Sequence, residues 1–223
     1  YKRQLIINIT KALACAGRIQ SIFDVKPGMQ DGTAGVRESD DEVPVVEFKN
    51  AALKYSGAGD TSIAGVSFKA YRGQTIGIIG GTGSGKSSLV GLIPRFYDAT
   101  EGEVLIDGVN VKDIKLEELR DKVGIVMQKA VLFKGSIRNN MQVAKQDATD
   151  GEIDEALAIA QAKEFVDKKD GRLDYMIEQG GKNLSGGQRQ RLTIARAVVK
   201  KPDVLILDDL SLIHISEPTR HSL

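Results

Sequence analysis

The apolar side chains of residues 5–24 recur at a helical spacing, with polar and basic side chains between them. This pattern predicts an amphipathic helix. Packing of the helix against its own domain would by itself account for the periodicity. Residues 25–42 contain prolines, glycines and an acidic cluster, a composition that can bury little apolar surface. We therefore expect a flexible linker after the helix.

From residue 43 the pattern changes to short apolar runs, which are typical of strands and alternate with helical periodicity. We expect strands at residues 43–48, 66–70, 75–79, 103–106, 124–127 and 204–207. We expect helices at residues 87–93, 116–122, 153–168 and 185–200. Strands that alternate with helices predict an α/β domain whose sheet is mostly parallel at its centre.

Composition narrows the class of protein. The chain has 223 residues, of which 41% are hydrophobic, so we expect one globular core. Lys and Arg number 31 against 30 Asp and Glu, and this balance gives no reason to expect nucleic acid as a partner. Cys15 is the only cysteine, which excludes an internal disulfide and mildly favours the cytosol. The sequence contains no apolar run long enough for a complete transmembrane helix, and its first residues lack the pattern of a signal peptide.

A glycine-rich segment between the expected strand 75–79 and the expected helix 87–93 fits the pattern G-x-x-x-x-G-K-S. Glycines let successive backbone N–H groups turn toward phosphate oxygens, and the start of a helix adds partial positive charge. Lys86 is expected to reach the β- and γ-phosphates, and the Ser87 hydroxyl to bind Mg²⁺. A glycine-rich turn without nucleotide is the weaker alternative. The residues expected to contact the nucleotide here are Gly80, Gly81, Thr82, Gly83, Ser84, Gly85, Lys86, Ser87 and Ser88.

A second candidate is the apolar run 204–207, which ends in Asp208 and Asp209. A buried strand would place Asp208 at the carboxyl edge of the sheet, where the phosphate loop also lies, and Asp208 could then help to hold Mg²⁺. Taken alone, such a run is more often a strand that enters a turn. The phosphate loop makes the magnesium interpretation the stronger one.

The segment Leu184, Ser185, Gly186, Gly187 and Gln188 lies before that strand and resembles the signature of ABC proteins. Ser185 is a good N-cap for the helix that follows, whose positive end would face an anion. The resemblance implies that this anion is the γ-phosphate of ATP bound by a partner domain. It also implies the ABC ATPase fold: a P-loop NTPase (RecA-like) core sheet with an antiparallel β subdomain and an inserted α-helical subdomain, incomplete at its C-terminus.

Other roles follow from the resemblance alone. Tyr55 matches the aromatic residue that stacks on adenine, Gln128 matches the glutamine that touches Mg²⁺ and the attacking water, and Glu178 matches an exporter loop. Asp209 stands where the family usually has the glutamate that polarises this water. The expected catalytic set is Lys86, Gln128 and Asp209, and the expected metal set is Ser87, Gln128 and Asp208. A lone tyrosine or glutamine would more often be structural.

The resemblance also divides the chain. Residues 43–209 match the ATP-binding domain, residues 1–24 resemble the cytosolic end of the last transmembrane helix of an exporter, and 25–42 form the linker. Residues 210–223 lack the family's Ser-Ala-Leu-Asp loop and its switch histidine. They resemble a translated sequencing adapter, so we expect a non-native tail and negligible hydrolysis by the isolated chain.

These observations lead to one preferred function. The chain is expected to bind and hydrolyse ATP with Mg²⁺ as one nucleotide-binding domain of a pair that drives export, at the cytoplasmic face of a bacterial plasma membrane. Because Asp209 accompanies an intact signature, the pair resembles a heterodimeric exporter. A soluble ABC ATPase without a membrane domain is the alternative. A small-molecule kinase would leave residues 184–188 unexplained.

Overall fold

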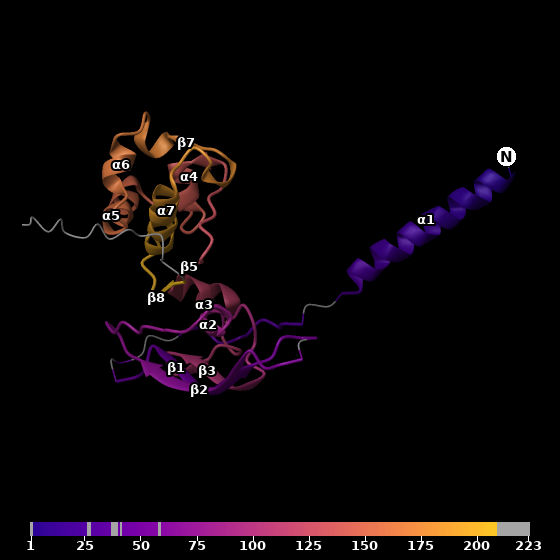
Figure 1. The fold of residues 1–223 in the computed structure, drawn as a ribbon, viewed down its shortest axis with the longest axis horizontal. Coiled ribbons are helices and arrows are strands. Elements are labelled where there is room, and N and C mark those ends of the chain that lie inside the picture. Colours follow the sequence, from indigo (N-terminus) through magenta and orange to yellow (C-terminus); the bar gives the residue numbers. More distant parts are fainter. Residues whose placement is uncertain (1, 26–27, 37–39, 41, 58, 209–223) are drawn as a thin grey trace, which may run out of the picture. The chain divides into compact units, whose positions relative to one another are not determined.

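The computed structural model describes residues 2–25, 28–36, 40, 42–57 and 59–208. They fall into two units, Tyr1–Gln30 and Asp31–Leu223. The expected C-terminal tail, residues 210–223, and the candidate Asp209 lie outside the described residues. Figure 1 follows the chain through its elements.

The first unit contains the predicted N-terminal helix, α1 (Lys2–Phe23) (Figure 1). None of its residues is buried, and its apolar side chains, such as those of Leu13 and Phe23, are exposed. Within the described part of the chain, no helix has both the length and the apolar character that crossing a membrane requires. The relation of α1 to a membrane domain therefore stays a prediction.

The second unit begins with an antiparallel sheet of order β2-β1-β3-β4. Its strands are β1 (Val46–Leu53), β2 (Ile63–Ala70), β3 (Glu101–Ile106) and β4 (Val109–Asn110). A two-residue turn joins β3 to β4, and both Asp107 and Gly108 have positive φ, 48° and 77°. Asp-Gly is the pair that such a tight hairpin favours. This sheet is the antiparallel β subdomain that the resemblance implied.

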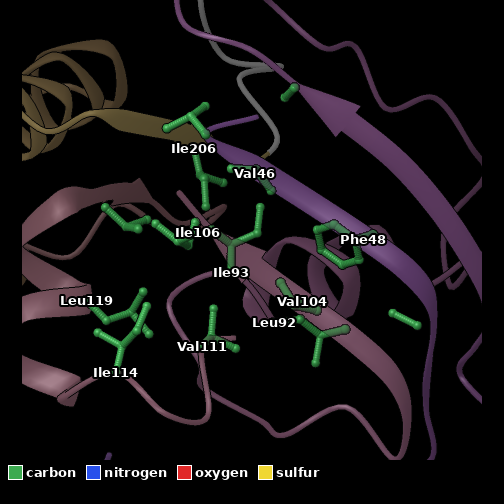
Figure 2. Packing of buried hydrophobic residues seen from close by; sticks show 14 of the residues in the cluster. Val46, Phe48, Leu92, Ile93, Val104, Ile106, Val111, Ile114, Leu119 and Ile206 are labelled. Atoms are coloured by element: carbon green, nitrogen blue, oxygen red, sulfur yellow. The ribbon is translucent and has the colours of Figure 1, made fainter. Parts of the chain in front are cut away.

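One face of this sheet packs on the short helices α2 (Lys86–Gly91) and α3 (Leu116–Lys122). Figure 2 shows apolar side chains of β1 and β3 meeting those around α2 and α3, with Ile206 at one side. Several of these side chains are fully buried, among them Phe48, Leu92, Ile106, Ile114 and Leu119. Burial of apolar surface on this scale is the main force that holds the sheet and helices together.

The parallel part of the fold is one pair of strands, β5 (Val123–Val126) and β8 (Val204–Leu207). The strand expected at residues 75–79 is not formed, and this expectation was wrong. Ile76 and Ile78 line the same cavity as β8, but residues 75–79 form no ladder with it. The expected parallel centre is therefore limited, among the described residues, to β5 and β8.

The remaining elements form a helical region with a second core. The elements are β6 (Gly135–Ser136), α4 (Ile137–Gln142), α5 (Asp150–Ile159), α6 (Lys163–Asp167), η1 (Arg172–Asp174), β7 (Met176–Ile177), η2 (Gln179–Gly181) and α7 (Gly186–Val198). The expectation of a single core was wrong, because Leu157, Leu192 and their neighbours form a cluster distinct from that of the antiparallel sheet.

The helix expected at residues 153–168 is divided into α5 and α6. Gln161 has φ 54°, a left-handed conformation that a helix cannot contain. The Ala162 N–H donates to the carbonyl of Leu157 at 2.7 Å, which closes α5 with a wide turn. Neither alanine nor glutamine predicts such a break, because both favour helices.

Candidate functional site

The phosphate loop has the conformation that its glycines allow. Gly83 and Gly85 have φ 80° and 86°, in the left-handed region that L side chains rarely adopt. At Gly85 a Cβ atom would also lie 2.6 Å from the carbonyl oxygen of Ser62, a backbone atom that cannot easily move. Gly85 is the N-cap of α2 and has no side-chain cap. The loop therefore enters the helix without a side chain covering its N–H groups.

Lys86 lies folded into its own loop. Its Nζ donates hydrogen bonds to the carbonyl oxygens of Gly80 and Gly81, both at 2.8 Å. An ammonium group has three donors, so it can exchange these carbonyls for phosphate oxygens without leaving the loop. The Lys86 ammonium group thus lies at the phosphate loop, which the sequence predicts to bind the β- and γ-phosphates.

A cavity of about 700 Å³ brings the main candidates together. The phosphate loop, α2 and β8 all contribute residues to its lining. Gln128 and Asp208 lie beyond the carboxyl ends of β5 and β8, and the Asp208 N–H continues the ladder with a hydrogen bond to Val126 at 2.8 Å. The predicted site residues that line the cavity are Gly80, Thr82, Gly83, Lys86, Ser87, Gln128 and Asp208.

Other predicted loop residues do not line this cavity. Gly81, Ser84, Gly85 and Ser88 belong to the same loop and helix but lie outside its walls. Gly81 still contributes by its carbonyl oxygen, which accepts from Lys86. Ser84 closes the loop, because its N–H donates to the carbonyl of Gly81 at 3.2 Å.

The oxygen atoms at this cavity are suited to magnesium. Within the described residues, no group of three or more His, Cys, Asp or Glu side chains could hold a metal by itself. The cavity instead offers the Ser87 hydroxyl, the Gln128 amide oxygen and the Asp208 carboxylate. Mg²⁺ is commonly held by one or two carboxylates together with phosphates and water. The donor set therefore fits a magnesium ion that arrives with a nucleotide.

Tyr55 is not part of the cavity. Its hydroxyl donates to Ser88 Oγ at 2.8 Å, and its ring meets that of Tyr97 edge-on, with 4.9 Å between centroids. It lines a separate depression of about 510 Å³ next to the antiparallel sheet. The hydrogen bond ties the ring to α2, two residues after Lys86. Sequence reasoning missed Tyr97, for which no motif gives a signal.

The signature segment forms the start of α7. Ser185 Oγ accepts from the Gln188 N–H at 3.2 Å, and Gln188 Oε1 accepts from the Ser185 N–H at 3.1 Å, which is a complete capping box. A Cβ atom at Gly186 or Gly187 would meet no atom within 4 Å. Leu184 is buried in the helical region. None of the five residues lines the cavity, so the structure does not bring the signature to this chain's own phosphate loop.

Two further features concern the loop before the signature and the helix that follows it. Glu178 is exposed, and its N–H donates to Asn183 Oδ1 at 3.0 Å, which holds the loop before the signature. Arg196 of α7 lies over the Phe133 ring at 5.5 Å and donates to the Val131 carbonyl at 2.9 Å. Burial lowers the pKa of Arg196. Arg196, which sequence reasoning missed, therefore connects the segment after Gln128 to the signature helix.

Comparison with known proteins identifies the family of this chain. Residues 63–211 match the family model described as ABC transporter. The chain is 39% identical over 212 residues to the β-(1→2)glucan export ATP-binding/permease protein NdvA of Rhodopseudomonas palustris, covering 92% of this chain and 34% of the relative. It is 44% identical over 164 residues to a putative multidrug export ATP-binding/permease protein, YgaD, of Bacillus subtilis. This match covers 74% of this chain and 28% of the relative.

A lipid A-core flippase of Haemophilus influenzae is 39% identical over 198 residues, covering 88% of this chain and 33% of the relative. Among solved structures, a bacterial Atm1-family ABC exporter with ATP bound matches with a TM-score of 0.83 and 31% identity, covering 93% of this chain and 36% of that chain. The chain spans about a third of the length of these curated relatives. It belongs to the ABC transporter family, as an ATP-binding domain homologous to those of ABC exporters.

Proposed function

We propose that the chain binds the phosphates of ATP together with Mg²⁺ in the 700 Å³ cavity, with the adenine outside it on Tyr55, and that it hydrolyses ATP as part of a complete transporter. The observation that carries this proposal is the convergence of the phosphate loop, Gln128 and Asp208 on one cavity. They belong to three segments far apart in the sequence. Their meeting fits the phosphate-binding and magnesium-binding roles that the motif assigns to them.

Each side chain has a defined role in this proposal. Lys86 releases the carbonyls of Gly80 and Gly81 and binds the β- and γ-phosphates. Ser87, Gln128 and Asp208 would hold Mg²⁺, which would supply positive charge to offset the negative charge that develops on the phosphates. Asp209, outside the described residues, is proposed to orient the attacking water with Gln128.

A second nucleotide-binding domain is proposed as partner. The N-terminus of α7 is open beside Gly186 and Gly187, and it does not line the cavity of its own chain. An anion that binds there would come from another chain, as the γ-phosphate of the partner's ATP. Asp209 in place of the usual glutamate supports a partner of different sequence, in a heterodimer.

Transport is proposed for the whole protein. The named relatives are ATP-binding/permease proteins and a flippase, and the chain spans about a third of their length. We infer that a transmembrane domain in the same protein couples hydrolysis to export, with this domain at the cytoplasmic face of a bacterial plasma membrane. None of these relatives is described as a soluble ATPase, so they do not support the alternative of an ABC ATPase without a membrane domain.

Tyr55→Ala tests ATP binding and the role of the ring together. Stacking of a base on an aromatic ring contributes about 1–3 kcal/mol, so we expect affinity for ATP to fall about tenfold. Affinity for inorganic triphosphate, which has no base, should stay at the wild-type value. Isothermal titration in Mg²⁺ measures both ligands. Tyr55→Phe is the matched control, because it retains the ring and loses only the bond to Ser88.

The possible outcomes of this titration separate two ideas. Failure of the wild-type chain to bind ATP saturably would contradict the proposed function. Wild-type binding of ATP, with an equal loss of ATP and triphosphate affinity in Tyr55→Ala, would contradict only the stacking role of Tyr55.

A further inference from the structure

A cluster of four charged side chains joins the amino ends of the segments that carry the site to the turn after β3. Asp107 is at its centre, with a side chain that is 0% exposed. Arg72 contacts it at 3.2 Å and Lys122 at 2.8 Å. Asp203 completes the ion cluster, 3.2 Å from Lys122 and 3.7 Å from Arg72. Among the described residues, the cluster therefore contains two cations and two carboxylates.

The position of the ion cluster in the sequence is specific. Lys122 directly precedes β5, and Asp203 directly precedes β8. The first ladder pair, Val123 with Val204, follows immediately. Arg72 lies shortly before the segment 75–79, which leads into the phosphate loop. The three segments that end in the phosphate loop, Gln128 and Asp208 thus all begin beside the same buried carboxylate.

The contact between Lys122 and Asp203 can fix the register of the parallel pair. The ladder of β5 with β8 has only four residue pairs, from Val123 with Val204 to Val126 with Leu207. A shift by one residue would turn every side chain of a strand to the opposite face. Such a shift would turn Asp208 away from the cavity. The ion pair would oppose it, because the observed register brings Lys122 Nζ within 3.2 Å of the Asp203 carboxylate.

Electrostatics favour a charged Lys122 in this place. Its burial alone would lower the pKa of the ammonium, but hydrogen bonds and charges from Asp107 and Asp203 outweigh that effect and raise its pKa. Without Lys122, Asp107 would lose the cation that lies 2.8 Å from its carboxylate and would keep that of Arg72. A buried carboxylate that loses a partner is strongly destabilised, so the cluster resists rearrangement.

We propose that Lys122 and Asp203, held by Asp107 and Arg72, are positioning residues that set the register of β5 against β8 and so place Gln128 and Asp208 as a joint magnesium-binding pair. This inference rests on the proposed function, because it assigns the cluster a role in binding Mg²⁺ with ATP. The cluster acts from the end of the strands opposite to the metal. Arg72 and Asp203 line the same cavity as the site residues, whereas Lys122 does not, so the replacement of Lys122 tests positioning alone.

The inference is tested with Lys122→Met, which keeps the bond between Arg72 and Asp107. ATP affinity is measured by isothermal titration in Mg²⁺ and in EDTA, and the ratio of the two dissociation constants is the Mg²⁺ enhancement. We expect this enhancement to fall about tenfold, as for other residues that orient metal ligands. Affinity in EDTA should stay unchanged, because the phosphate loop is not altered. Lys122→Arg, which keeps the charge, should restore most of the enhancement.

Lys163→Met provides a matched control. Lys163 also faces two aspartates, Asp154 at 3.7 Å and Asp167 at 2.9 Å, but on α6, and it does not line the cavity. Its loss should leave the enhancement at the wild-type value. If Lys122→Met does not fold, Asp203→Asn is the milder variant, because Asp203 is partly exposed, and the same fall is expected.

The remaining outcomes would overturn the inference. An unchanged enhancement in Lys122→Met, or equal losses in Mg²⁺ and in EDTA, would show that the cluster contributes only to stability. A wild-type chain that binds ATP equally well with and without Mg²⁺ would also contradict it, because Gln128 and Asp208 would then hold no metal. A wild-type chain that binds no ATP would contradict the proposed function itself.

Discussion

Replacing Lys86 by alanine is expected to lower the affinity of the chain for ATP by about 10- to 100-fold. A hydrogen bond to a charged group contributes about 1.5–3 kcal/mol, and each 1.4 kcal/mol is a factor of ten. Lys86 already lies over the phosphate loop, where it donates to Gly80 and Gly81. The change therefore removes a cation from the place where the β- and γ-phosphates would lie. Isothermal titration with ATP and Mg²⁺ measures the loss.

Lys112→Ala is the matched control for this prediction. Lys112 also donates to a backbone carbonyl, that of Ala99 at 2.9 Å, but it does not line the cavity. Its replacement should leave ATP affinity unchanged. Thermal unfolding without nucleotide should show that both variants remain folded. Wild-type affinity in Lys86→Ala would refute the assignment of the cavity as a triphosphate site.

The phosphate loop could be predicted from the sequence because its conformation is local. Gly83 and Gly85 encode left-handed backbone at fixed positions, and Lys86 follows directly. The place of Asp208 was also predictable, because it follows an apolar strand and the carboxyl ends of parallel strands share an edge, whereas Gln128 was expected there from the family resemblance alone. The parallel pairing of β5 with β8 bears this out.

What could not be predicted depends on contacts between distant segments. Residues 75–79 have the apolar pattern of a strand, but a strand also needs a partner, and here they form no ladder with β8 although both line one cavity. The pattern of residues 153–168 is continuous, yet the chain turns at Gln161. The ion cluster has no motif, since Asp107 and Asp203 lie far apart in sequence and resemble ordinary surface charges. Only the fold brings them together.

A substitution in the signature can test its role in ATP turnover without a loss of stability. Ser185→Ala would remove the cap of α7 and cost about 1 kcal/mol of stability, which complicates any effect on activity. Gly187→Ala removes no bond, and its Cβ would meet no atom of the chain within 4 Å. Alanine in place of a helical glycine should, if anything, stabilise the domain, by up to about 1 kcal/mol. ATP binding by the chain itself should be unchanged.

In the full-length protein assembled with its partner, Gly187→Ala should nevertheless reduce ATP turnover by up to about a hundredfold. The added methyl group would stand between α7 and the partner's γ-phosphate, and misplacement of reacting groups by about 1 Å can cost this much. Gly151→Ala is the matched control. Gly151 also follows the first residue of a capped helix, α5, with no atom within 4 Å of its Cβ position. Steady-state phosphate release measures turnover.

The same assay decides whether the two ATP sites differ. Asp209 has a side chain one methylene shorter than glutamate, so its carboxylate should hold the attacking water poorly, and Asp209→Asn should change turnover little. Gly187→Ala acts on the other site, where the partner would supply the catalytic glutamate, and should change turnover far more. A full-length chain that is active as a homodimer and loses all turnover in Asp209→Asn would show instead that Asp209 is the catalytic base of two equivalent sites.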